Sequence, residues 1–106
     1  MAEEQLLRSI KLGFSKPLIL WLLRSKPRSG YELIKEVMRL TGVKLKPSFI
    51  YPFLHSLERG GYLAGRWAER GRRRIKYYHV TEKGERLLQR IREIFKSGFG
   101  EVLLSL

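Results

Sequence analysis

The order of the secondary-structure elements is decided by residues 47–80, which read PSFIYPFLHSLERGGYLAGRWAERGRRRIKYYHV. Near the start of this stretch, Ile50, Leu54 and Leu57 recur at the spacing of one helical face. Two consecutive glycines then provide a natural helix end. The pattern therefore predicts a helix over residues 48–59.

A β-hairpin is predicted directly after this helix. Residues 62–69 and 75–80 are rich in the aromatic and β-branched types that strands favour. The polar connector between them, residues 70–74, contains a glycine. A short glycine-containing connector between two strand-like runs indicates a hairpin.

Three helical segments are predicted upstream. Residues 3–12 carry apolar side chains on one side, and Gly13 interrupts them. A second, buried helix should run over residues 15–24 until a proline stops it. The third helix, residues 29–40, starts at a capping box, in which Ser29 and Glu32 exchange hydrogen bonds with backbone N–H groups. It should end at Thr41-Gly42.

Downstream, Thr81 is a suitable N-cap for a long terminal helix. Gly98 and Gly100 lower the helical propensity of its second half, so we expect a bend or a close backbone approach there. Three helices followed by a two-stranded hairpin form a winged helix-turn-helix. The predicted fold class is thus mainly α with a small β-hairpin, a winged helix-turn-helix followed by a long C-terminal helix.

Composition excludes several classes of protein. The chain has 106 residues, enough for one domain, and 43% of them are hydrophobic, which excludes a disordered basic tail. Cys is absent, which fits a reducing, cytoplasmic location. The longest apolar run, residues 18–23, is far shorter than the ~20 residues that span a bilayer, so no membrane partner is expected. Acidic charge carried only by Glu, together with the absence of Asn and Cys, favours a thermophilic source.

The sequence offers no set of residues for catalysis. Its two histidines, His55 and His79, are accompanied by no Asp or Cys, and no Glu is spaced with either of them to form a metal site or a proton relay. We therefore expect no enzymatic activity, no metal and no cofactor.

The positive charge is concentrated in one segment. The formal net charge is +12, and residues 59–76 hold seven basic residues against one acidic residue, a net charge of +6. A hairpin tip with four arginines repels itself unless a polyanion lies against it, and duplex DNA is such a polyanion. A solvated basic face is the alternative interpretation. Two rival functions also stay open: a non-specific basic nucleic-acid-binding protein associated with chromatin or RNA, and a dimeric module whose wing binds an acidic protein.

The helix at 48–59 is suited to contact DNA at its N-terminus, where Ser48 can donate to phosphate. Tyr51 can reach a phosphate or a thymine methyl group, and the alternative is packing against the preceding helix. His55 can contact a base edge or be a neutral surface residue. Pro52 fits this helix only if it lies close to the first turn, where no N–H donor is needed.

The terminal helix predicts a homodimer. It carries nine apolar residues, more than it can bury against a domain of about 80 residues, and a second copy would cover the remainder. Two-fold symmetry would place two recognition helices about 34 Å apart on a pseudo-palindromic site. The predicted domains are therefore a DNA-binding domain, residues 1–80 with the wing at about 62–80, and a dimerisation helix, residues 81–106. The predicted interface residues are Leu6, Leu7, Ile10, Leu88, Ile91, Phe95, Phe99, Val102, Leu103 and Leu106.

Three segments together resemble the PadR family of transcriptional regulators. They are Ser29-Gly30-Tyr31-Glu32, the run from Ser48 to Leu63 with its Ile50-Tyr51-Pro52 core, and the run from Arg74 to Gly84. The resemblance implies a winged-helix repressor that works as a homodimer through its last helix, and the single terminal helix resembles the short subfamily.

The resemblance also implies that Tyr31, Ser48 and Tyr51 contact the DNA backbone. Some short members bind flat aromatic or cationic effectors between subunits. Here Phe95 and Phe99 are the aromatic residues available for a small-molecule effector, and plain packing is the alternative. With the residues argued above, the predicted contacts to double-stranded DNA are Tyr31, Lys46, Ser48, Phe49, Tyr51, Pro52, His55, Arg59, Arg70, Arg72, Arg73, Arg74 and Lys76.

Overall fold

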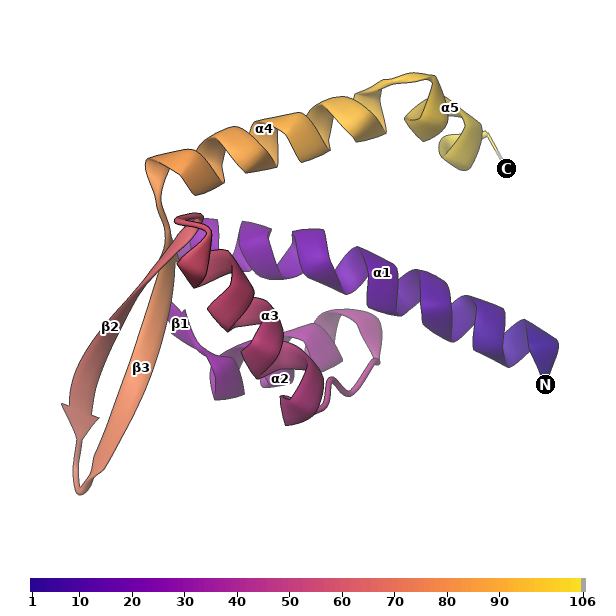
Figure 1. Ribbon diagram of the computed structural model, residues 1–106. Helices are drawn as coiled ribbons and strands as arrows, with labels where there is room; N and C mark the ends of the chain where they lie inside the picture. Colours follow the sequence, from indigo (N-terminus) through magenta and orange to yellow (C-terminus); the bar gives the residue numbers. More distant parts are fainter. Residues whose placement is uncertain (106) are drawn as a thin grey trace.

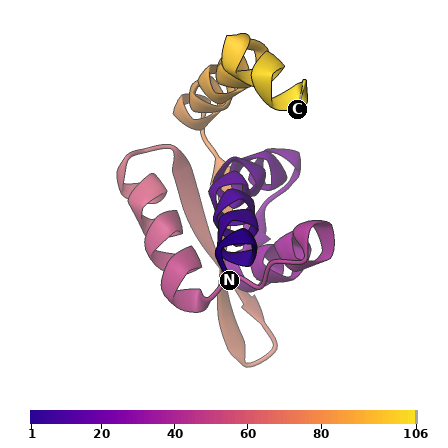
Figure 2. The same ribbon diagram turned by 90° about the vertical axis from the view of Figure 1, so that its right-hand side faces the viewer.

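The computed structural model describes residues 1–105 and has the predicted mainly helical fold with a small antiparallel sheet (Figure 1). Three helices and the hairpin surround one core, and a fourth helix lies along the first (Figures 1 and 2). The elements are α1 (Ala2–Ser25), β1 (Arg28–Ser29), α2 (Gly30–Thr41), α3 (Pro47–Arg59), β2 (Leu63–Arg70), β3 (Arg73–Val80), α4 (Glu82–Lys96) and α5 (Gly98–Leu104).

The core is built from the three helices and the two long strands of the winged domain. Helix α1 contributes most to it, through four buried hydrophobic side chains of its second half. The connector between α2 and α3 also enters the core, because Val43 and Leu45 are buried while Lys44 and Lys46 face solvent. The buried hydrophobic residues are Ile19, Leu20, Leu22, Leu23, Leu33, Val37, Val43, Leu45, Ile50, Leu54, Leu63 and Tyr78.

Helix α2 begins and ends as the sequence predicts. The Ser29 hydroxyl accepts a hydrogen bond from the Glu32 backbone N–H, and the Glu32 carboxylate accepts one from the Ser29 backbone N–H. At the other end Gly42 adopts φ = 76°, and its N–H donates to the carbonyl of Met38. A left-handed glycine is the usual end of a helix because it carries no Cβ that would clash.

The prediction of two separate helices before residue 26 was wrong, because α1 is a single helix of 24 residues. Pro17 removes only the hydrogen bond to the carbonyl of Gly13. Burial of the following leucines holds the second half of the helix in place. No helix within residues 1–105 is both long and apolar enough to cross a membrane.

Helix α3 confirms the predicted segment but not the expected place of Pro52. The helix starts at Pro47, with Lys46 as its N-cap, so Pro52 is its sixth residue and lies in the second turn. The proline removes the donor that would bond to the Ser48 carbonyl. The helix continues because the side chains on either side of Pro52, Ile50 and Leu54, are fully buried.

The sheet has three strands in the order β1-β3-β2, one more than predicted. Two residues of β1 pair with Tyr77 and Tyr78 of β3, a contact that a two-residue segment does not reveal in sequence. The hairpin turn is also tighter than the predicted five-residue connector. Arg70 pairs with Arg73, which leaves only Gly71 (φ = 65°) and Arg72 at the tip. Glycine first in a two-residue turn is typical of type II′.

The terminal helix is divided in two, which confirms the expected bend near Gly98. Helix α4 ends at Lys96, and Ser97 is extended (φ = −77°, ψ = −177°) before α5 starts. Thr81 caps α4 as predicted, through a hydrogen bond from the Gly84 N–H. Helix α4 lies along α1, tied at one end by the Arg24–Glu85 ion pair (3.0 Å).

Candidate nucleic-acid interface

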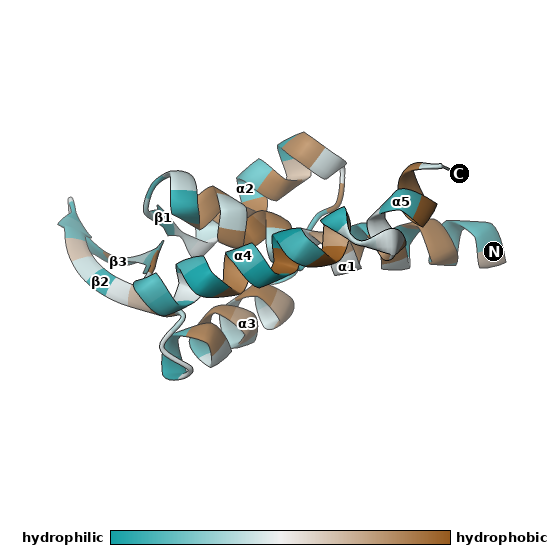
Figure 3. Cartoon of the chain, turned by 90° about the horizontal axis from the view of Figure 1, so that it is seen from above, coloured by the Kyte–Doolittle hydropathy of each residue, from teal (hydrophilic) through white to brown (hydrophobic). Residues whose placement is uncertain are grey.

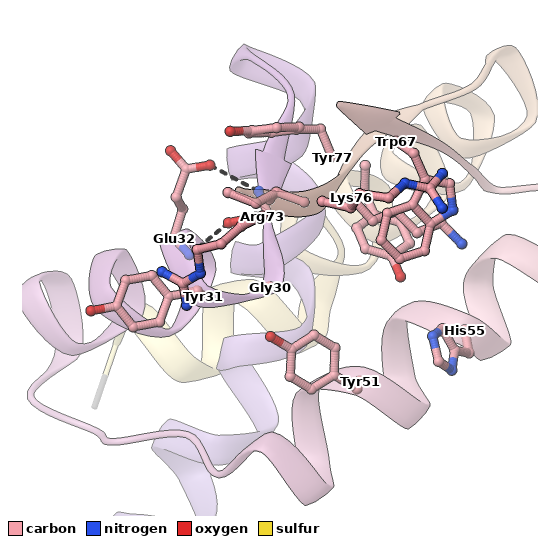
Figure 4. A pocket seen from close by; sticks show the side chains of 13 residues that line it. Gly30, Tyr31, Glu32, Tyr51, His55, Trp67, Arg73, Lys76 and Tyr77 are labelled. Atoms are coloured by element: carbon pink, nitrogen blue, oxygen red, sulfur yellow. Dashed lines mark hydrogen bonds between the residues drawn. The ribbon is translucent and has the colours of Figure 1, made fainter. Parts of the chain in front are cut away.

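A cleft of about 590 Å³ lies where the start of α2, the face of α3 and the wing meet (Figure 4). Tyr31 and Tyr51 lie on its helical side, and Trp67 and Lys76 lie on its wing side (Figure 4). The lining is aromatic and basic, a combination that suits a phosphate backbone and its sugars. The lining residues are Ser29, Gly30, Tyr31, Glu32, Tyr51, His55, Trp67, Arg73, Arg74, Ile75, Lys76, Tyr77 and Tyr78.

Tyr51 is positioned by a glycine on the neighbouring helix. A Cβ built on Gly30 would lie 2.5 Å from Cε1 of Tyr51 and 3.1 Å from its hydroxyl oxygen, so the ring rests directly on the first residue of α2. The Tyr51 hydroxyl therefore lies beside the N-terminus of α2, where the capping box uses the Ser29 and Glu32 N–H groups and the helix dipole attracts anions. Tyr51 keeps 38% of its surface exposed, and Tyr31 keeps 65%.

Lys76 is held on the wing side of the cleft by an ion pair with α3. Its ammonium donates to Oε1 of Glu58 at 2.7 Å and lies 5.8 Å from the Trp67 ring centre and 5.2 Å from that of Tyr78. The hydrogen bond to Glu58 is the main reason that the pKa of Lys76 is raised above its ordinary value. Burial raises the pKa of Tyr78 above 10.0.

The strand register divides the wing charges between two faces. Residues directly opposite each other in a hairpin point to the same face. Trp67, Glu69, Arg74 and Lys76 therefore share the inner face, which is turned toward α3. There the two acids Glu58 and Glu69 balance Arg74 and Lys76.

The outer face carries charge without balance. Arg66, Arg70 and Arg73 share it with Tyr77, and no acidic residue of β2 or β3 lies among them. The Arg70 guanidinium lies 5.6 Å from the Tyr77 ring centre and donates to its hydroxyl at 3.3 Å. Arg73 and Tyr77 also line the cleft, so the part of β3 that carries them forms the rim between the two faces.

A second exposed surface lies at the opposite end of the molecule, far from the wing. It combines the first half of α1 with α5 and the end of α4, where hydrophobic segments recur (Figure 3). The two parts meet at Phe14 and Phe95, whose ring centres are 5.6 Å apart. We call this the distal apolar surface, and it comprises the exposed residues Leu6, Leu7, Ile10, Phe14, Ile94, Phe99, Val102 and Leu104.

Comparison with known proteins identifies the family. A family model described as "Transcriptional regulator PadR-like family" matches residues 19–90, about two thirds of the chain. The chain belongs to the PadR-like family of transcriptional regulators. Members of this family regulate transcription, so the prediction that the chain is not an enzyme is confirmed. No curated protein matches the chain.

Several solved structures have the same fold as this chain. A PadR family regulator from Eggerthella lenta is 28% identical with a TM-score of 0.81, and the match covers 96% of this chain and 92% of that one. A Streptococcus mutans protein is 33% identical with a TM-score of 0.67, covering 77% of this chain and 76% of that one. Bacillus subtilis PadR, solved in complex with operator DNA, is 32% identical with a TM-score of 0.64, covering 70% of this chain and 44% of that longer one.

The cleft gathers six of the thirteen predicted contact residues, and the other seven lie outside it. Pro52 and Arg59 are exposed along α3, where they share a shallow depression with His55 and Glu58. Phe49 is half-buried, with its ring centre 6.1 Å from that of Phe53. The six in the cleft are Tyr31, Tyr51, His55, Arg73, Arg74 and Lys76; the exposed remainder are Lys46, Ser48, Arg70 and Arg72.

The residues of this region that were missed from sequence include Glu58, Arg66 and Trp67. The alternation of side chains along the two strands could have found Arg66 and Trp67. Trp67 lies directly opposite Lys76, and Arg66 lies directly opposite Tyr77. Glu58 gave no signal, since its partner Lys76 is eighteen residues away. For the dimer, Leu88 and Ile91 are half-buried against this chain's own core, and Leu106 lies outside the described residues.

Proposed function

We propose that the protein is a sequence-specific DNA-binding regulator, and a repressor, that binds a pseudo-palindromic operator as a homodimer. The observation that carries the proposal is the cleft, in which the start of α2, the exposed face of α3 and a basic wing converge in a PadR-like chain. The Bacillus subtilis relative solved with operator DNA supports the same class of target. Repression follows if the bound dimer occupies a promoter.

The two halves of the interface have different tasks. The α2 N-terminus, Tyr31, Tyr51 and the wing arginines suit phosphates, which fix the position of a protein on DNA without selecting a sequence. Discrimination among DNA sequences is assigned to the exposed face of α3, where the His55 side chain can form a hydrogen bond to a base edge. No Arg or Lys precedes Arg59 on this helix, so DNA shape should contribute to the choice of site.

The homodimer is supported by the distal apolar surface. Leu6, Phe99 and Val102 are 62%, 56% and 60% exposed, and a contiguous apolar patch of this kind marks an interaction site. A second copy related by a two-fold axis would cover it and present two α3 helices to successive major grooves about 34 Å apart. Phe95 packs on Phe14, which favours a packing role for this aromatic residue over an effector site.

The test is the salt dependence of duplex binding by the variant Arg72→Gln/Arg73→Gln. Each lost phosphate contact should lower the slope of log affinity against log salt by about 0.9, so two should lower it by about 1.8 on every duplex. Arg86→Gln/Arg90→Gln on the exposed side of α4 removes the same charge away from the wing and serves as the control.

An unchanged slope in the wing variant would contradict the assignment of the wing. The alternative function, a non-specific nucleic-acid-binding protein associated with chromatin or RNA, predicts the same slope change but equal affinity for all duplex sequences, or a preference for RNA. The proposed function and this alternative are therefore distinguished by measuring the affinity of the same variant for several duplex sequences and for RNA.

A further inference from the structure

The ion pair between Glu58 of α3 and Lys76 of the wing occupies space that is free because residue 65 is a glycine. A Cβ on Gly65 would lie 2.7 Å from Oε2 of Glu58 and would also collide with Cε of Lys76. The pair therefore occupies the space above a glycine, with the side chains of Lys76 and Glu58 only 21% and 29% exposed. The lysine is drawn toward α3 and away from open solvent.

Two aromatic rings also lie beside the Lys76 ammonium. The Trp67 and Tyr78 ring centres lie within 6 Å of the ammonium, the range of a cation–π contact. Glu58 adds a full negative charge to this arrangement, at the edge of a cleft that we assign to a polyanion. A carboxylate at this position both occupies the ammonium and repels an approaching phosphate.

We propose that Glu58 is an affinity-limiting residue: its carboxylate occupies the Lys76 ammonium and so withholds one phosphate contact from any DNA that enters the cleft. The inference rests on the proposed function. Glu58 is a positioning residue in this account, because it acts through Lys76. A regulator limited in this way spends less time on DNA that lacks its site, since binding to such DNA comes from phosphate contacts.

The test measures anisotropy of a fluorescent random-sequence duplex between 50 and 200 mM salt, using Glu58→Gln in the full-length protein. The variant should bind more tightly than the unmodified protein, with a slope steeper by about 0.9. Its advantage should therefore shrink by about 3.5-fold across this fourfold range of salt. Glu36→Gln is the matched control, because Glu36 forms an ion pair with Arg39 on α2 and does not line the cleft.

Lys76→Gln shows whether Glu58→Gln steepens the salt slope by freeing the lysine or only by removing one negative charge from the protein. In our account Lys76→Gln alone leaves the slope unchanged, and Glu58→Gln adds no steepening in the Lys76→Gln background. The inference is overturned if Glu58→Gln has the slope of Glu36→Gln, or if its steepening survives without Lys76. Should Glu58→Gln fail to fold, Lys76→Gln decides by itself, since a slope reduced by about 0.9 would show that the lysine already contacts phosphate.

Failure of the inference differs from failure of the proposed function. If the unmodified protein binds duplex with a clear salt slope and only the Glu58 result is negative, the inference alone falls. If the unmodified protein shows no salt-dependent binding to duplex, the proposed function falls and takes the inference with it.

Discussion

The substitution Gly30→Ala should weaken DNA binding without weakening the fold. The new Cβ would lie 2.5 Å from Cε1 of Tyr51, whereas an ordinary contact needs about 3.4 Å, so the ring must move by roughly 0.9 Å. The movement costs little, because Tyr51 is exposed on its other side and the atoms in contact belong to the outer end of its side chain. Alanine is also the better helix former, by up to about 1 kcal/mol.

The loss in affinity follows from the hydrogen bond that Tyr51 is proposed to make. A hydrogen bond to a charged group contributes about 1.5–3 kcal/mol, which corresponds to roughly a 10- to 150-fold loss in affinity when the hydroxyl is displaced. Fluorescence anisotropy with a labelled duplex measures this loss, and thermal melting followed by circular dichroism checks the fold.

Two further variants make the result specific to Tyr51. Gly13→Ala is the matched control, because a Cβ at Gly13 meets nothing within 4 Å, and its affinity should equal that of the unmodified protein. Tyr51→Phe should lose about as much as Gly30→Ala, and the double variant should lose no more than either. Full affinity in Gly30→Ala, with an unchanged melting temperature, would refute the contact assigned to Tyr51.

Three other outcomes are expected. Val102→Glu should convert the dimer to a monomer in sedimentation velocity, whereas Met38→Glu, at a similarly exposed apolar position on α2, should leave the dimer intact. If the Val102→Glu variant is still a dimer, α5 is not part of the interface. Arg73→Gln should reduce the salt slope more than its neighbour Arg74→Gln, because Glu69 lies opposite Arg74, and equal reductions would contradict the division of the wing into two faces. Gly84→Ala should lower the free energy of unfolding by about 1–3 kcal/mol in urea titrations, because the new Cβ would collide with the Tyr62 carbonyl and lie 2.7 Å from Cγ1 of Val80. Unchanged stability would show that α4 can shift on the wing.

The sequence predicted the parts of the fold that depend on local chemistry. The capping box at Ser29, the left-handed Gly42 and the N-cap Thr81 each act within a few residues, and all three lie where expected. The break of the terminal helix was also predictable, because two glycines weaken it at one place.

The remaining features of the fold depend on contacts between distant segments. Gly13 and Pro17 are locally unfavourable to a helix, but burial of the leucines beyond them outweighs that preference. Strand β1 exists only because β3 offers it an edge. Once α1 is known to be continuous, Leu7, Phe14 and Trp21 recur every seven residues, and this spacing would have revealed Phe14 as part of the distal apolar surface.

The candidate site was predicted as a set of residue types but not as a balance of charges. Counting basic residues between Arg59 and Lys76 indicated a segment from which three basic residues line the cleft. The count treated all of these charges as equivalent. Strand register and the Glu58–Lys76 pair divide them into a balanced inner face and an unbalanced outer one, and neither depends on a short sequence pattern.

The central claim, that this PadR-like protein selects a DNA sequence as a dimer, is tested most directly by selection of bound duplexes from a random pool. We expect enrichment of a pseudo-palindrome whose two half-sites are centred about one helical turn, 10–10.5 base pairs, apart. Recovery of duplexes with no enriched sequence, at an affinity that depends only on salt, would contradict it.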